Sequence, residues 1–245
     1  MARFFLEVSY KGTAYSGFQV QANAVTIQSE VEKALSTYYR QPFSLTGSSR
    51  TDAGVHALQN FFHFDSDIPV HNDHLYHLNA ILPADIVAKN FFSVNENAHA
   101  RFDAISRTYQ YHIYQTKNPF FEDRAWFYPY PLDIQKLNEA ANLLTLFHNF
   151  QSFAKKNAQV KTFECTIIQS NWIATDYGLM YEVTANRFLR GMVRALVATQ
   201  LKVGRGKLSA HQFTKIITEA NAANADFTSP ACGLFLSLVK YPYQL

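Results

Sequence analysis

One order of secondary-structure patterns occurs twice along this chain, and this repeat limits the folds that are open to it. Apolar residues alternate in the expected strands and recur at helical spacing in the expected helices. The first half reads strand, helix, strand, strand, helix, strand, which is the βαββαβ order of a ferredoxin-like unit. These elements are expected at residues 3–10, 27–38, 44–48, 58–64, 71–81 and 86–94, with Thr26 as the cap of the first helix.

The second half repeats this order and adds one helix, which Ser209 and Gln212 open as a capping box. The sequence therefore predicts an α+β fold made of two fused ferredoxin-like halves, residues 1–104 and 105–245. Joined edge to edge, the halves would form one continuous, mostly antiparallel sheet with a central cleft. The elements of the second half are expected at residues 107–115, 134–144, 163–174, 179–185, 188–203 and 233–241.

Composition is typical of a folded intracellular enzyme or binding protein. Of the 245 residues, 48% are hydrophobic, which is enough for a sizeable core. The first ten residues alternate and carry charges, unlike a signal peptide, and no apolar run reaches the length of a membrane span. Cys165 and Cys232 alone do not form a disulfide framework. We therefore expect a soluble cytoplasmic protein.

Charge is only mildly basic, with a net charge of +3, but the cations are clustered. Arg187, Arg190 and Arg194 recur at helical spacing, and Lys155, Lys156 and Lys161 form a second group, among others. For any one cluster, a solvated surface is the simpler interpretation. Several clusters in a chain with 15% aromatic residues also favour an RNA surface, because unpaired bases stack on rings while cations bind phosphates.

The densest group of reactive side chains lies at residues 48–57, SSRTDAGVHA, between two expected strands. Loops of this kind often carry catalytic residues. Asp52, followed by Ala53 and Gly54, is by itself more typical of a turn. Nearby guanidinium groups at Arg50, Arg190 or Arg194 would favour an ionised Asp52 nucleophile, but such a pair can equally be a structural ion pair.

Two other groups of residues leave alternatives open. Tyr109 and Tyr111 share one face of an expected strand, where a tyrosine either packs or stacks on a base and moves a proton. His71, His74 and His77 recur every third residue, whereas helical zinc sites place two histidines four apart. A metal hydrolase is therefore a weak alternative, and the sequence has no phosphate-binding glycine loop, nucleophilic-serine elbow or Cys-x-x-Cys pair.

Several motifs together resemble those of the tRNA pseudouridine synthase A family. The stretch RTDAGVHA at residues 50–57 is similar to the family signature, and the resemblance extends along nearly the whole chain in the same order. The other matching stretches are YSGFQVQ at 15–21, NAILP at 79–83, HARF at 99–102, RTYQY at 107–111, SF at 152–153, NRFLRGMVR at 186–194 and GLF at 233–235.

The resemblance implies an isomerase that converts uridine to pseudouridine at positions 38, 39 and 40 of the tRNA anticodon stem-loop. It implies that Asp52 is the nucleophile, that Tyr109 packs on the target base, and that Arg194 pairs with the nucleophile. Arg50 would help to extrude the base, and Leu234 would contact the uracil. The family is homodimeric, with tRNA lying across both subunits, and its reaction requires no metal, nucleotide or redox cofactor. A catalytically silent RNA-binding module is the alternative on the same scaffold.

Two residues depart from the family pattern. Ser49 stands where the family usually has glycine, which could alter the loop, because glycine permits backbone conformations that serine resists. Phe18 replaces a tryptophan and keeps an aromatic ring. Neither change removes a reacting group, so we expect activity to be retained.

Overall fold

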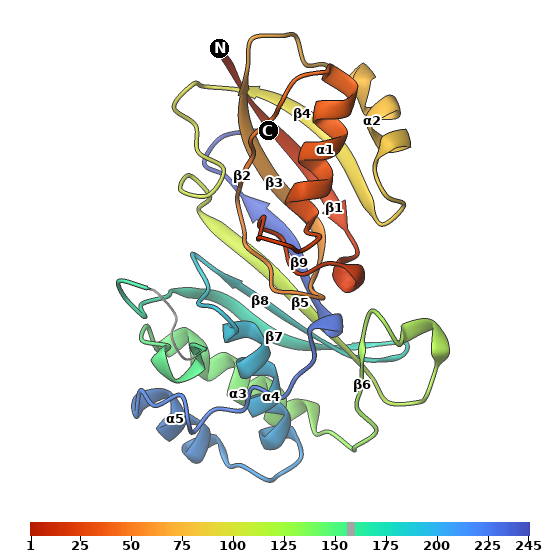
Figure 1. Cartoon of the computed structure of the whole chain (residues 1–245). Coiled ribbons are helices and arrows are strands. Elements are labelled where there is room, and N and C mark those ends of the chain that lie inside the picture. Colours follow the sequence, from red (N-terminus) through yellow and green to blue (C-terminus); the bar gives the residue numbers. More distant parts are fainter. Residues whose placement is uncertain (156–159) are drawn as a thin grey trace. The chain divides into compact units, whose positions relative to one another are not determined.

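The computed structural model describes residues 1–155 and 160–245, and the chain divides into two compact units. The first consists of Met1–Ile105 with Phe235–Leu245, and the second of Ser106–Leu234. Each combines helices with strands that pair mostly antiparallel, so the expected α+β class is confirmed (Figure 1). The closing strand belongs to the first unit, although it follows the second in the chain.

The first unit contains a sheet in the order β4–β1–β3–β9, with helices α1 and α2 beside it (Figure 1). Strand β1 pairs antiparallel with both β3 and β4, whereas β3 pairs in parallel with β9, placing Ala57 opposite Leu236. The bounds are β1 Ala2–Tyr10, α1 Ile27–Tyr39, β2 Thr46–Gly47, β3 His56–Ser66, α2 Leu75–Ile81, β4 Ile86–Val94 and β9 Leu234–Lys240.

Most local expectations for this unit are confirmed. Thr26 caps α1 in a capping box with Ser29, and the apolar face of α1 is buried. The expected strand at 44–48 is shorter, since only Thr46–Gly47 pairs with β3. The expected helix at 71–81 opens with a 3-10 turn, Asn72–His74, before α2 begins.

The second unit contains the antiparallel strands β5, β8 and β7, in that order, and the α-helices α3, α4 and α5. A short strand that the sequence did not indicate, β6, pairs in parallel with β5. The bounds are β5 Ser106–Tyr114, β6 Trp126–Phe127, α3 Ile134–Leu143, β7 Ile167–Thr175, β8 Gly178–Ala185, α4 Met192–Gly204 and α5 Ala210–Thr218.

The expected helix at 188–203 was wrong at its start, because α4 begins only at Met192. Gly191 precedes it with φ +74°, a left-handed conformation that glycine adopts readily. Arg187 and Arg190 therefore precede the helix, and they do not share a helical face with Arg194. The expected capping box of Ser209 and Gln212 is present at the start of α5.

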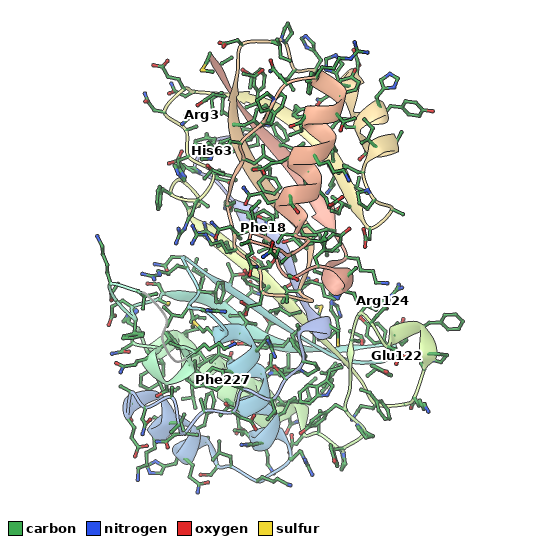
Figure 2. The ribbon with its side chains drawn as sticks, in the orientation of Figure 1. Arg3, Phe18, His63, Glu122, Arg124 and Phe227 are labelled. Carbon is green, nitrogen blue, oxygen red and sulfur yellow. The ribbon has the colours of Figure 1, made fainter. Side chains whose placement is uncertain are left out.

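His63 is a buried titratable group in the first unit. Its ring on β3 is 8% exposed, its Nδ1 accepts the N–H of Ala100 at 3.2 Å, and its centroid lies 4.5 Å from that of His99. Burial is the main cause that lowers the pKa of His63 from 6.5 to about 4, with smaller contributions from His99 and Arg3. Figure 2 shows Arg3 and His63 in the same part of the first unit. His63 is therefore neutral in the folded protein at pH 5.

We predict that the protein loses stability as the pH falls from 6.5 toward 4, partly through His63. In that window the unfolded state binds the imidazole proton and the folded state does not, so acid favours unfolding. In a His63→Gln variant, which keeps an acceptor for the N–H of Ala100, the difference in unfolding free energy between pH 7 and pH 5 should be smaller by about 1–3 kcal/mol. Urea unfolding at pH 7 and pH 5 measures it. The exposed His211→Gln is the control, and an unchanged pH dependence in His63→Gln would contradict the assignment.

Candidate functional site

The loop at residues 48–55, between β2 and β3, carries the candidate nucleophile. Arg50 is exposed and Asp52 is half-buried, while Thr51 between them is buried with 7% of its surface exposed. The loop therefore turns Thr51 inward and leaves both flanking charged residues accessible. A loop that alternates exposed and buried side chains in this way keeps its conformation only if other residues hold its backbone.

A buried chain of polar groups supplies these contacts. The hydroxyls of Tyr10 and Thr51 share a hydrogen bond of 2.7 Å. The Asn60 amide donates to the Tyr10 oxygen at 3.2 Å and to the carbonyl of Ser49 at 2.9 Å. Asn60 is fully buried, so these bonds form in a medium of low dielectric, where they are strong and where losing one is costly. The loop is thereby fixed at Ser49 and at Thr51, on both sides of Arg50.

The neighbouring loop at residues 12–18 also contacts the loop that carries Asp52. The N–H of Phe18 donates to the carbonyl of Thr51 at 3.1 Å, and the N–H of Gly12 donates to His56 Nδ1 at 3.1 Å. Gly12 lies so close that a Cβ there would stand 2.0 Å from the carbonyl oxygen of Val55. Only glycine permits this approach, which brings the two loops into direct backbone contact.

The turn that the sequence indicated at Asp52 is present. The carbonyl of Asp52 accepts the N–H of Val55 at 3.2 Å, and Gly54 has φ +77°. This turn is closed by the main chain of Asp52, so a turn and a chemical role for its carboxylate are compatible. The two interpretations do not exclude each other.

The two departures from the family pattern fit this loop. In the described part of the chain, Ser49 is not among the residues with positive φ, so its position does not require glycine. Phe18 is buried and stacks on Phe62 with ring centroids 4.6 Å apart and an interplanar angle of 11°. The aromatic ring that Phe18 keeps is therefore packed inside the first unit.

The second unit carries the remaining candidates, and its two tyrosines differ in environment. Tyr111 is fully buried and donates its hydroxyl to the carbonyl of Pro230 at 2.8 Å. Burial raises the pKa of Tyr111 strongly, so this hydroxyl stays protonated. Tyr109 is partly exposed and packs edge-to-face on Phe188, with ring centroids 5.0 Å apart. Tyr111 has a structural role, and Tyr109 is the more accessible of the two.

Arg194 is held in place from the segment that leads to β9. Its Nε donates to the carbonyl of Ser229 at 2.8 Å, and the Ser229 hydroxyl donates to the carbonyl of Arg194 at 2.8 Å. Along the same segment, Gly233 lies on the Tyr111 ring, where a Cβ would approach ring carbons to 2.8 Å. Leu234 follows and is buried. One segment thus ties Arg194 and Leu234 to β5.

The predicted residues are divided between the two units. Arg50 and Asp52 share the loop of the first unit, and Tyr109, Arg194 and Leu234 lie on or beside connected elements of the second. The anchoring residues were not found from the sequence. Tyr10 ends an alternating strand and Asn60 lies in the middle of another, and neither position has a motif that distinguishes it from ordinary packing.

Two further cations follow Arg194 in the chain, Lys202 and Arg205, and each has a partner. Lys202 forms a salt bridge of 2.8 Å with Asp226, and the Arg205 guanidinium lies 3.7 Å from the centroid of the Tyr130 ring. Both cations therefore have partners within the second unit, and the Lys202 side chain is still 47% exposed. Lys156 of the second cluster lies outside the described residues.

The three histidines take part in an aromatic cluster with α1. The Tyr39 hydroxyl and His74 Nδ1 share a hydrogen bond of 2.8 Å, and the His77 ring stacks on Tyr38 at 5.8 Å. Within residues 1–155 and 160–245, no three His, Cys, Asp or Glu side chains are grouped as metal ligands. A bilayer span would need a longer and more apolar helix than any in these same ranges.

Comparison with known proteins gives matches over the full length. A family model described as tRNA pseudouridine synthase matches residues 140–242. The chain is 45% identical to the tRNA pseudouridine synthase A of Porphyromonas gingivalis, covering 100% of this chain and 99% of that protein. It is 45% identical to the protein of that name from Bacteroides fragilis, covering 99% and 98%, and 37% identical to one from Staphylococcus aureus, covering 97% and 91%. These similarities span both units.

We predict that Asn60→Leu loosens the loop that carries Asp52. The substitution leaves the Ser49 carbonyl and the Tyr10 hydroxyl without their amide donor, which should lower the free energy of unfolding by about 2–4 kcal/mol. Hydrogen exchange at residues 49–55 should become faster. Asn79→Leu is the matched control, since it removes two hydrogen bonds to Ala88 on β4, away from this loop. Equal exchange at residues 49–55 in the wild type and Asn60→Leu would contradict the anchoring role.

Proposed function

Because the chain belongs to the tRNA pseudouridine synthase A family, an isomerase family that acts on tRNA uridine, we propose that it converts uridine to pseudouridine at positions 38, 39 and 40 of the anticodon stem-loop. The observation that carries the proposal is the rigid loop that presents Asp52. This loop is held at Ser49 and Thr51 by buried hydrogen bonds, while Arg50 and Asp52 remain accessible.

The reaction exchanges one bond to ribose for another. The bond between uracil N1 and ribose C1′ breaks, and a new bond forms between C5 and C1′. C5 loses its proton and N1 gains one, so the product is an isomer of the substrate. No electrons are gained or lost overall, and the chemistry therefore requires no redox cofactor.

Asp52 is the nucleophile in this proposal. A carboxylate that attacks carbon has to be ionised and held in position, and a neighbouring guanidinium favours the charged form. The short loop and its buried anchors support a fixed position for Asp52 before substrate arrives, which reduces the entropy lost on reaching the reactive geometry. Attack at ribose C1′ and attack on the uracil ring both lead to the same isomer.

The second unit supplies the groups that surround the base. Tyr109 packs on the uracil and assists removal of the C5 proton, Arg194 pairs with the Asp52 carboxylate, and Leu234 gives an apolar contact. This arrangement requires the two units to be joined as two ferredoxin-like halves, with a continuous sheet and a cleft that Asp52 and Tyr109 both enter. The ordered positions of Tyr109 against Phe188 and of Arg194 against Ser229 support these roles.

The target uridine has to leave the stem before it can react. Extruding a base from a paired stem requires a few kcal/mol, which phosphate contacts elsewhere on the protein can offset. In this proposal Arg50, which is exposed and two residues before Asp52, fills the space that the base leaves. We further propose that the protein acts in the cytoplasm as a homodimer, with one tRNA lying across both subunits.

Replacing the nucleophile should abolish turnover without abolishing binding. Asp52→Asn keeps the shape of the side chain and removes its charge, so kcat should fall by at least ~10³-fold. Release of tritium from tRNA labelled at uracil C5 measures the reaction, and filter binding measures the affinity for tRNA. Asp67→Asn is the control, because the Asp67 side chain is 70% exposed and follows β3 at the end opposite to the loop. Wild-type release by Asp52→Asn would end the assignment.

The two roles of Tyr109 can be separated by two substitutions. Tyr109→Phe keeps the ring and removes the hydroxyl, so kcat should fall by about 10²–10⁴-fold with little change in KM. Tyr109→Leu also removes the stacking surface and should raise KM. Tyr130→Phe, at an exposed tyrosine of the same unit, controls for loss of a hydroxyl. If Tyr109→Phe has the kcat of the wild type, the tyrosine has no part in proton removal.

A further inference from the structure

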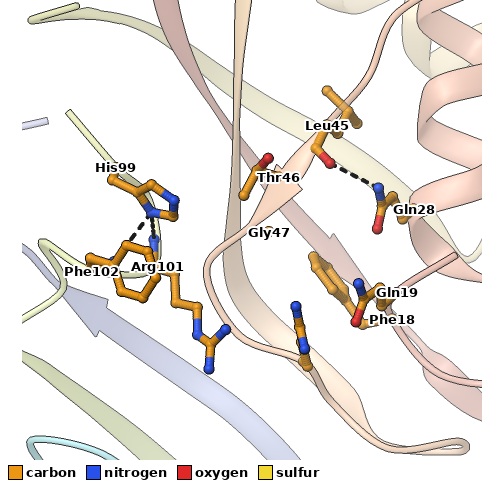
Figure 3. A pocket seen from close by; sticks show the side chains of 10 residues that line it. Phe18, Gln19, Gln28, Leu45, Thr46, Gly47, His99, Arg101 and Phe102 are labelled. Carbon is orange, nitrogen blue, oxygen red and sulfur yellow. Dashed lines mark hydrogen bonds between the residues drawn. The ribbon is translucent and has the colours of Figure 1, made fainter. Parts of the chain in front are cut away.

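A pocket in the first unit opens beside the loop of Asp52. It has a volume of about 260 Å³, smaller than the ~300–1,000 Å³ typical of small-molecule sites, and therefore suits a single planar group. Figure 3 shows His99 and Phe102 on one side of the pocket, Phe18 and Gln19 on the other, and Thr46 between them. The lining residues are Phe18, Gln19, Gln28, Leu45, Thr46, Gly47, Arg50, His99, Arg101 and Phe102.

Phe102 presents an aromatic surface at this pocket. Its side chain is 73% exposed, and its ring lies 4.2 Å from that of His99, with an interplanar angle of 36°. The Arg101 guanidinium is 5.6 Å from the Phe102 centroid. An exposed ring with a cation beside it suits an unpaired nucleotide, whose base stacks on the ring while its phosphate meets the cation.

The loop that carries Phe102 is held firmly, although its side chain is exposed. Ala100 is fully buried, its N–H donates to His63, and its carbonyl accepts the Tyr241 hydroxyl at 2.6 Å. The N–H of His99 donates to the Asp103 carboxylate at 2.8 Å. His63 on β3 and Tyr241, which follows β9, therefore fix this loop from outside, and the bond from His99 to Asp103 closes it from within. Phe102 is thus offered to a ligand at little further cost in backbone entropy.

The remaining lining groups suit the edge of a base. His99 Nδ1 accepts the N–H groups of Arg101 and Phe102, which leaves the proton of the neutral ring on Nε2 as a donor. Burial lowers the pKa of His99, which favours that neutral form. Gln19 and Thr46 add polar groups, and no lining residue that the structure describes is acidic. The pocket thus combines donors, acceptors and positive charge, and it contains no carboxylate that would repel a phosphate.

Arg50 connects this pocket to the proposed chemistry. It lines the pocket and stands two residues before Asp52, so their Cα atoms are at most about 7 Å apart. We propose that the pocket is a second nucleotide site, which holds the unpaired base of a nucleotide next to the target uridine against Phe102, with the phosphate bound by Arg101. This assignment rests on the proposed function, since it takes the target to be at Asp52.

Binding measurements on the full chain test the site. Phe102→Ala should weaken the affinity for an anticodon stem-loop RNA by about 5- to 100-fold, the usual effect of losing one stacked base. Phe102→Tyr should retain the affinity. Phe120→Ala is the matched control, because Phe120 is 79% exposed and does not line the pocket. Wild-type affinity in Phe102→Ala would overturn the proposal, and so would a loss accompanied by a change in the oligomeric mass, which would identify a contact between copies.

A set of RNAs that each lack one base identifies the occupant. For the RNA that lacks the base in the pocket, the wild type and Phe102→Ala should bind equally well, and for the others the difference should persist. If the affinities of the wild type and Phe102→Ala differ for every RNA in the set, the pocket holds no base and the proposal is overturned. If the two affinities become equal only when the target base is missing, the pocket holds the target base and not its neighbour. Tritium release by the wild type tests the proposed function separately. The isomerase assignment can therefore fail while the pocket still binds a base, and the pocket can fail while the isomerase assignment holds.

Discussion

The hydrogen bonds beneath the loop of Asp52 are the interaction on which the proposed chemistry depends most. Asn60 and Tyr10 are buried on adjacent strands, and together they hold Ser49 and Thr51. Groups buried in this way are stable only when they are bonded, so the loop has one favourable conformation and many costly ones. The core of the first unit thereby determines where Arg50 and Asp52 stand.

In the second unit, too, hydrogen bonds fix the segments that carry or adjoin the proposed site residues. Ser229 and Arg194 exchange two hydrogen bonds, and Tyr111 fixes the next residue, Pro230. Each contact joins a strand or helix to a segment that has no regular structure. In both units the side chains proposed to meet the uridine lie beside buried, bonded neighbours, which gives them defined positions before the RNA binds.

Features that depend on local sequence could be predicted, and features that depend on distant partners could not. The Thr26 cap and the alternating strands follow from neighbouring residues, and both are present. The parallel pairing of Ala57 with Leu236 joins distant segments and leaves no local pattern. The late start of α4 results from the backbone at Gly191, within a stretch that reads as helical. Asp52 was found because its motif is contiguous, whereas Asn60 was missed because its role exists only in three dimensions.

The central claim is that Asp52 of the first unit and Tyr109 of the second act on one nucleotide. A crystal structure of the full-length Asp52→Asn variant with an anticodon stem-loop RNA tests this most directly. The account predicts one uridine outside the stem, its C1′ or its base within about 3–4 Å of the side chain at position 52 and its base against the Tyr109 ring. A structure in which position 52 and Tyr109 contact different nucleotides, or in which the uridine remains paired, would contradict it.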